Sequence, residues 1–290
     1  GFGGGSSMDT AKLVAYLAHP EQRQTLSDIY GVNQANGARL PLIQVPTTAG
    51  TGSEVTPISI VTTATGKSGV VSQQLLPDLA ILDAQLTVGL PGPVTAATGI
   101  DAMVHAIEAY TSKLRKNPIS DLLAREALRL LSANLEQAVR APQDLEARQA
   151  MLLGACLAGQ AFANAPVAAV HALAYPLGIT FHLPHGLSNA LVLNPVLTFN
   201  LSHAHALYAE LASCVLGERL LPGDGAAQLI EELRRIHEAV GLPLRLRDAG
   251  VTLESLPELA RSAMQQQRLL VNNPRPVLEE DALAIYTAAY

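Results

Sequence analysis

One long central segment of this 290-residue chain carries no Asp, Glu, Lys or Arg. It begins after Arg148 and ends before Glu210. Because charged residues are mostly exposed in folded proteins, a segment without them is expected to be buried. Pro166, Pro176 and several polar residues interrupt it, so it has no run of about 18 apolar residues, the length that a membrane helix needs. We therefore interpret the segment as buried helices of a soluble domain and expect no membrane partner.

Two patches of the sequence combine histidine with few competing charges. In the first, Asp101 and His105 are four residues apart, so on a helix they share one face. In the second, His171 lies in a helical pattern and His185 follows at a turn. One oxygen and three nitrogen donors suit Fe(II) or Zn(II) better than calcium or magnesium. The spacing alone fits both a metal site and core histidines that are hydrogen-bonded to carbonyl groups.

The composition indicates a large, ordered, cytoplasmic protein. Hydrophobic residues make up 49% of the chain and charged residues 15%, which supports a large core and argues against disorder. The net charge is -6 and no basic cluster occurs, which argues against a nucleic-acid partner. Cys156 and Cys214 fall in apolar helical patterns, and we interpret them as reduced thiols. The length allows one large domain or two ordinary ones.

The first part of the chain has an α/β pattern. It opens with a glycine loop at 1–6, before which we expect no strand, and Ser6 is predicted to cap a helix that ends near His19. Asp9 is expected to complete a capping box with Ser6. Bare N–H groups at such a helix start favour phosphate binding, with a plain tight turn as the alternative. Short buried strands are predicted at 40–46, 58–62, 69–72 and 79–83.

The helix- and strand-breaking run Pro91-Gly92-Pro93 predicts the end of the α/β part. After it, nearly all of the sequence has helical periodicity. Helices are predicted at 94–111, 119–139, 143–163, 166–176, 188–198, 203–216, 223–240 and 253–266, with a last one from Leu278. The predicted fold class is therefore α/β followed by all-α. Before the boundary, the hydroxyl-rich run Thr47–Glu54 suits close approach to a ligand, with a surface loop as the alternative.

Four motifs of this chain resemble those of iron-containing (group III) alcohol dehydrogenases, in the same order. They are Gly3-Gly4-Gly5-Ser6 with Asp9 and Lys12, the run Pro46–Glu54, and the patches Gly99–His105 and His171–His185. The resemblance covers essentially the whole chain. It implies a partial Rossmann-like NAD(P)-binding domain at 1–92, with its first part missing. It also implies an all-helical metal-binding domain at 93–290, the two together being dehydroquinate synthase-like.

The resemblance also implies roles for individual residues. The metal ligands, for Fe(II) or in some members Zn(II), would be Asp101, His105, His171 and His185. Contacts to the cofactor would come from Gly4, Gly5, Ser6, Asp9, Thr47, Thr48, Thr51 and Lys67. Phe162 matches an aromatic residue near the nicotinamide and the substrate pocket. Tyr175 stands where many members have a further histidine, so Tyr175 or His182 is expected to take the proton-relay role.

The implied function is an iron-dependent alcohol dehydrogenase that interconverts a small alcohol and an aldehyde with NAD or NADP. The metal would act as a Lewis acid toward the reacting oxygen. The resemblance also implies a homo-oligomer, in the form of a dimer. Family members carry residues before the glycine loop that supply the first strands of the Rossmann half. Because this chain begins at the loop, we expect an exposed sheet edge, weak or absent NAD(P) binding, and dimerisation through that edge.

Three alternatives stay open. A reductase of the same superfamily acting on maleylacetate or a hydroxy acid would favour a basic residue in the pocket, for which Arg275 is the candidate. A catalytically silent chain that binds metal as a helical scaffold is favoured by the missing start of the cofactor domain. A metal-storage or sensing module would need no Thr47–Thr51 loop.

Overall fold

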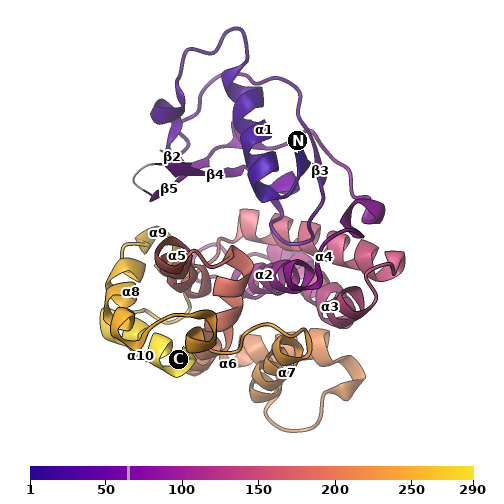
Figure 1. Ribbon diagram of the computed structural model, residues 1–290, viewed down its shortest axis with the longest axis vertical. Coiled ribbons are helices and arrows are strands. Elements are labelled where there is room, and N and C mark those ends of the chain that lie inside the picture. Colours follow the sequence, from indigo (N-terminus) through magenta and orange to yellow (C-terminus); the bar gives the residue numbers. More distant parts are fainter. Residues whose placement is uncertain (64–65) are drawn as a thin grey trace.

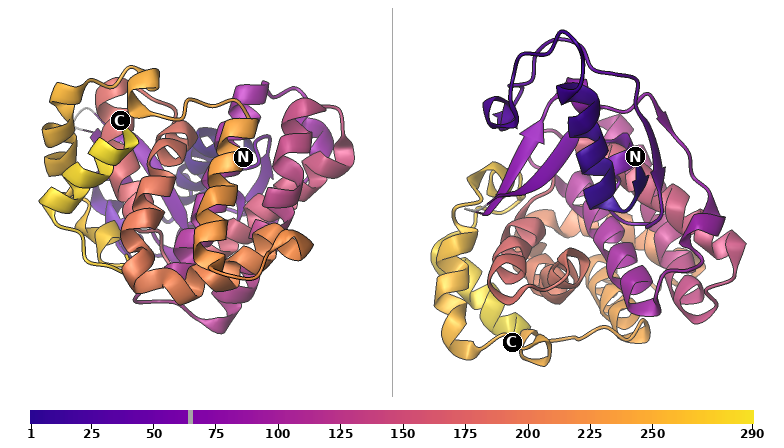
Figure 2. Two further views of the ribbon diagram at one scale, coloured as in Figure 1. Left: turned by 90° about the horizontal axis from the view of Figure 1, so that it is seen from below. Right: turned by 45° about the horizontal axis from the view of Figure 1, so that its top comes forward.

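The computed structural model describes residues 1–63 and 66–290. An α/β part (indigo to purple) lies against one end of a larger assembly of helices (Figure 1). Figure 2 shows the same arrangement from two further directions, with the C-terminal helices far from the N-terminus. The fold is therefore α/β followed by all-α, as the sequence predicts.

The strands form two small sheets. The strands of the described residues are β1 Phe2–Gly3, β2 Gly31–Val32, β3 Ile43–Pro46, β4 Ile58–Thr63, β5 Gly66–Val71 and β6 Leu79–Ala80. One sheet is parallel in the order β1-β3-β6, and in the other β5 pairs with β2 in parallel and with β4 in antiparallel fashion. A short strand, β1, lies inside the predicted glycine loop at 1–6, where Phe2 pairs with Val45. Phe2, Ile43 and Leu79 are exposed on the parallel sheet, which therefore presents apolar surface.

Helix α1 (Gly5–Leu17) begins directly after the loop. The predicted cap is wrong: Gly4 is the N-cap residue, it supplies no side-chain hydrogen bond, and Ser6 lies inside the first turn. The carboxylate of Asp9 turns to the neighbouring segment instead, where it accepts hydrogen bonds from Ser53 Oγ at 2.6 Å and Ile60 N at 2.8 Å. The first N–H groups of α1 are thus left without a side-chain cap.

Helices make up the rest of the described fold. They are α2 Gly92–Thr111, α3 Pro118–Arg140, α4 Leu145–Asn164, α5 Ala169–Phe181, α6 His185–Leu216, α7 Gly225–Ala239, α8 Leu256–Ala263, α9 Gln267–Leu270 and α10 Glu279–Ala289. Helix α2 packs against α3, α4 and α6, and most of its residues are buried. The prediction of two helices at 188–198 and 203–216 is wrong, because α6 is continuous through Pro195. Asn200, in the predicted break, is buried and exchanges side-chain hydrogen bonds with Asn273.

The uncharged segment forms most of α4, all of α5 and most of α6. Many of its apolar side chains belong to the main core cluster, which confirms that it is buried. Among the described helices, none alone has the length and hydropathy of a membrane span. Helices α4 and α5 reach that length and composition only as a pair, with a bend of 107° between them.

The loop that connects β3 to β4 presses its backbone against α4. Gly52, with a φ of 61°, lies so close to Gly159 that a Cβ added to Gly159 would be 2.7 Å from the Cα of Gly52. A left-handed φ and a contact of this kind both require glycine. The pair therefore fixes the α/β part against the helices at one point.

We expect Gly159→Ala to lower the free energy of unfolding by about 1–3 kcal/mol, because the added methyl group must push loop and helix apart. Urea denaturation followed by circular dichroism measures the change. Gly89→Ala is the matched control, since a Cβ there meets nothing within 4 Å. Equal unfolding midpoints for the two variants would contradict the close approach.

Candidate active site

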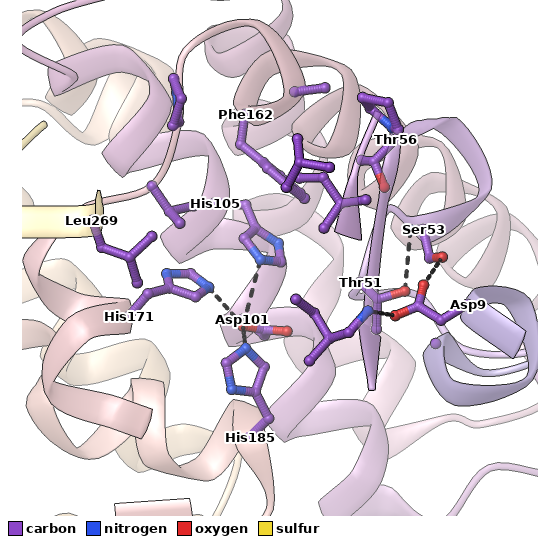
Figure 3. Close-up of a pocket in the computed structure, with 18 of the residues that line it drawn as sticks. Asp9, Thr51, Ser53, Thr56, Asp101, His105, Phe162, His171, His185 and Leu269 are labelled. Carbon is purple, nitrogen blue, oxygen red and sulfur yellow. Dashed lines mark hydrogen bonds and ion pairs between the residues drawn. The ribbon is translucent and has the colours of Figure 1, made fainter. Parts of the chain in front are cut away.

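Four side chains converge between α2, α5 and α6. Asp101 and His105 lie one turn apart on α2, His171 is on α5, and His185 is the first residue of α6. One donor atom from each lies within 4.8 Å of all the others. The Oδ1 atom of Asp101 is 3.9, 3.8 and 3.6 Å from the Nε2 atoms of His105, His171 and His185. Figure 3 shows the three rings pointing at the carboxylate.

The outer nitrogens of two of these rings have partners that orient them. His105 Nδ1 is 3.2 Å from the carbonyl oxygen of Gly50. His171 Nδ1 is 2.7 Å from Glu108 Oε2, and the other carboxylate oxygen of Glu108 accepts a hydrogen bond from the backbone N of Val170. With a proton on each Nδ1, both Nε2 lone pairs face the centre, which is the arrangement that carboxylates and carbonyls impose on metal-binding histidines.

The electrostatics of the cluster favour the metal-binding protonation states of His105 and Asp101, whereas Glu108 raises the pKa of His171. Burial lowers the pKa of His105 to about 3, so this imidazole is neutral. Burial acts to raise the pKa of Asp101, but the three surrounding imidazoles outweigh it, and the pKa is lowered. Burial also acts to lower the pKa of His171, but the hydrogen bond and charge of Glu108 outweigh it. An ionised carboxylate and a neutral imidazole are the forms that bind a metal.

Asn189 is the one amide inside the cluster. Its Nδ2 atom donates to Asp101 Oδ1 at 2.6 Å and lies 3.3 Å from the Nε2 atoms of His171 and His185. Its Oδ1 atom is buried and has no hydrogen-bond partner among the described residues. A carboxylate and three imidazoles so close together, with a single amide donor, lack the positive charge that would balance their lone pairs. This donor set fits a divalent iron or zinc ion.

One cavity of about 330 Å³ joins this cluster to the start of α1. Gly5, Ser6, Asp9 and Thr51 line its far end. A Cβ at Gly5 would be 3.0 Å from Thr51 Cγ2, so the loop and the helix start are in close contact there. Uncapped N–H groups and the positive end of the helix dipole suit a phosphate. The cavity thus offers a phosphate site and a metal site in one space.

The structure separates the remaining candidates. Phe162 and Tyr175 line the cavity; the Phe162 ring centroid is 4.4 Å from that of His105, and the Tyr175 ring centroid is 5.8 Å from that of His185. Burial raises the pKa of Tyr175, against the opposing charge of Arg268. His182 is not among the lining residues; it ends α5 in a left-handed conformation and is exposed.

Four of the cofactor candidates are not among the described residues that line the cavity. Gly4 and Thr48 are absent from its lining but face each other, since a Cβ at Gly4 would be 3.5 Å from Thr48 Cγ2. Thr47 follows β3 and donates its backbone N–H to Gly3 O. Lys67 belongs to β5, and its side chain lies outside the described residues.

Sequence reasoning did not find several residues that support the site. Glu108 lies three residues after His105 and seven after Asp101, a helical spacing that places all three on one face of α2. Asn189 lies four residues after His185, which is the same signal on α6. Lys12 belongs to the glycine-loop motif but carries no pattern that indicates burial.

Lys12 ties α1 to the loop beneath the cavity. Its Nζ atom donates to Ser53 Oγ at 2.8 Å, Thr56 Oγ1 at 3.2 Å and the Ile58 carbonyl at 2.6 Å. The side chain is fully buried. Burial lowers the pKa of Lys12 to about 8 and raises that of the nearby Glu54 to about 7. The ammonium group is thus the buried partner of Asp9 and Glu54.

We expect Lys12→Met to lower the free energy of unfolding by about 3–5 kcal/mol, because it leaves buried carboxyl groups without their cation. Guanidinium denaturation measures this loss. Lys113→Met removes an exposed lysine and is the control. A loss no larger than that of the control would show that Lys12 is not a structural cation.

A buried metal donor set that shares a cavity with a phosphate-binding helix start is the arrangement expected of a metal-dependent dehydrogenase that uses a dinucleotide. The comparisons agree. The family profile described as iron-containing alcohol dehydrogenase matches residues 1–84, and the profile for the C-terminal part of the Fe-containing alcohol dehydrogenase family matches residues 95–290.

Similar proteins point the same way. The long-chain-alcohol dehydrogenase 1 of Geobacillus thermodenitrificans is 45% identical, over 100% of this chain and 74% of that protein. A crystal structure of 1,3-propanediol oxidoreductase has a TM-score of 0.94 and 37% identity, covering 100% of this chain and 76% of the other. The NAD+ complex of sulfoacetaldehyde reductase from Bifidobacterium kashiwanohense has a TM-score of 0.87 and 30% identity, covering 99% and 74%.

The chain belongs to the iron-containing alcohol dehydrogenase family. The protein is accordingly an oxidoreductase, a metal-dependent, NAD(P)-linked alcohol dehydrogenase and aldehyde reductase. The resemblance drawn from the four motifs is confirmed, and so are the fold class and the cofactors that it implies.

Proposed function

We propose that Asp101, His105, His171 and His185 hold the iron ion, and that the protein interconverts a small alcohol and its aldehyde at this site. The observation that carries the proposal is the single cavity that contains both this donor set and the start of α1. Its far end takes the cofactor, with Gly4, Gly5, Ser6 and Asp9 at the pyrophosphate and the threonines of the 47–51 loop beside it. The cofactor-binding domain then spans 1–92 and the helical domain 93–290.

The chain's own residues position the reactants. The metal, when bound, supplies Lewis acidity toward the alcohol or carbonyl oxygen. Gly50 and Glu108 hold the rings of His105 and His171 in place through their Nδ1 atoms. Phe162 covers one side of His105 and excludes water from the reacting carbon. The Tyr175 hydroxyl, which lines the same cavity, is the proton donor in place of the exposed His182.

The thiols and the parallel sheet bear on the compartment and the oligomeric state of the enzyme. Both cysteines are free thiols, Cys156 buried and Cys214 partly so, which suits a reducing cytoplasm. Phe2 and Ile43 are exposed on the parallel sheet, and exposed apolar side chains of this kind suit contact with a second copy of the chain. On these grounds we propose a cytoplasmic homodimer.

Removal of one ligand tests the site. We expect Asp101→Ala to lose retained iron and NADH-forming turnover with 1-butanol together, because the variant lacks the one anionic donor of the set, whose charge attracts the dication. Elemental analysis and absorbance at the NADH band measure the two losses. His205→Ala is the control, because His205 pairs with Asp224 on the surface. Full metal content and turnover in the Asp101→Ala protein would refute the assignment.

Glu108→Gln tests the orientation of His171. The amide keeps the shape of the side chain but removes the carboxylate charge that faces the imidazole of His171. We therefore expect metal affinity to fall about 10–100-fold. Competition with a fluorescent chelator measures the affinity. Glu258→Gln, at an exposed pair with Arg261, serves as the reference. An affinity that matches the reference would mean that Glu108 only anchors the start of α5.

A further inference from the structure

We propose that Arg115 and Arg268, two guanidinium groups at the rim of the active-site cavity, bind an acidic group at the far end of the substrate. The preferred substrate is then an aldehyde, or its alcohol, that also carries a carboxylate or a sulfonate. The inference rests on the proposed function, because it places the reacting carbonyl at the metal cluster and the acidic group at the rim.

Both arginines line the cavity that contains the metal cluster. Neither guanidinium makes a hydrogen bond or an ion pair with any described residue. Most other arginines of the chain are neutralised: Arg129, Arg234 and Arg261, for example, each pair with a glutamate one helical turn away. Two unpaired guanidinium groups facing one cavity are therefore available to a ligand, and their fork of donors matches the oxygens of an acid group.

Hydrogen bonds hold together the segments that carry the two arginines. Three segments meet at the rim: the turn after α2, the link between α4 and α5, and the start of α9. Asn272, which is buried, joins them: its carbonyl accepts from Lys113 N at 2.7 Å, and its Nδ2 atom donates to Val167 O at 3.1 Å and Arg268 O at 3.2 Å. Ser112 Oγ adds a hydrogen bond to Pro166 O. The backbones beneath both guanidinium groups are thus held in one frame.

The space between the rim and the metal cluster is apolar. Phe162, Val167 and Leu269 line it, and Figure 3 shows Leu269 beside His171 and Phe162 beside His105. The two carboxylates that line the cavity, Asp9 and Asp101, are engaged with Ser53 and Ile60 and with the imidazoles, respectively. A short hydrocarbon chain with a carbonyl at one end and an acid at the other matches this order of surfaces.

The basic residue expected from the sequence does not serve this purpose. Arg275 stacks on the Phe199 ring at 3.8 Å, donates to the Phe199 carbonyl and lies 3.8 Å from Asp281. It is not among the residues that line the cavity. The prediction of Arg275 as a pocket residue is therefore wrong, and Arg115 and Arg268 supply the positive charge that a hydroxy acid would need.

The test compares aldehydes of similar length that differ in charge: butanal, 4-oxobutanoate and 3-oxopropane-1-sulfonate. For the wild-type enzyme we expect kcat/KM for at least one acidic aldehyde to exceed that for butanal about tenfold or more, and the better one identifies the acid. Arg115→Gln and Arg268→Gln should each lower the ratio of acidic to neutral kcat/KM about tenfold. Arg247→Gln removes another exposed arginine, away from the cavity, and should leave the ratio unchanged.

Two results would overturn the inference. One is a wild-type ratio near one. The other is a rise in the KM for NADH with an unchanged ratio in the Arg115→Gln and Arg268→Gln variants, which would assign the arginines to the cofactor. If no aldehyde is reduced at all, the proposed function has failed, and binding of succinate by calorimetry decides the inference separately. Affinity about tenfold weaker in Arg268→Gln than in Arg247→Gln supports it, and equal affinity rejects it.

Discussion

A single buried carboxylate, Asp101, constrains how helices α2, α5 and α6 pack around it. An isolated ionised carboxylate in a protein interior costs several kcal/mol unless charge or hydrogen bonds compensate it. Here Asn189 of α6 donates a hydrogen bond to the carboxylate, and three helices bring imidazoles around it: His105 from α2, His171 from α5 and His185 from α6. Each helix must keep its rotation and depth for its ring to reach the same point. The uncharged segment that forms much of α4, α5 and α6 keeps other charges away from this point.

The loop between β3 and β4 connects the helices that carry the cluster to the α/β part. The carbonyl of Gly50 holds His105, Gly52 rests on α4 through Gly159, and Ser53 binds both Asp9 and Lys12 of α1. One short segment therefore contacts both the histidine cluster and α1. The loop needs glycines because its backbone lies so close to neighbouring segments. It needs hydroxyl groups because they form hydrogen bonds with the polar side chains of α1. A change in this loop is expected to affect both halves of the site.

The sequence predicts local features of this site well and tertiary ones poorly. Spacing of four residues places Asp101 and His105 on one helical face, and the same rule would have found Glu108. The exposure of His182 depends on a left-handed residue at the end of α5, which no pattern announces. The continuity of α6 depends on the pairing of Asn200 with Asn273, which is distant in sequence. The rim at Asn272 likewise exists only because three separate segments meet there.

The charges around the cavity follow a pattern that the overall composition conceals. The chain has a net charge of -6, but the cavity is lined by a helix N-terminus, by two unpaired guanidinium groups and by the four proposed metal ligands. Fixed positive groups within a low-dielectric cleft concentrate anions and speed their arrival. In the proposed binding mode, a dinucleotide brings its negative charge to the helix end. A neutral alcohol would leave the guanidinium groups at the rim without a partner, whereas an acidic aldehyde would pair them at the moment its carbonyl reaches the cluster.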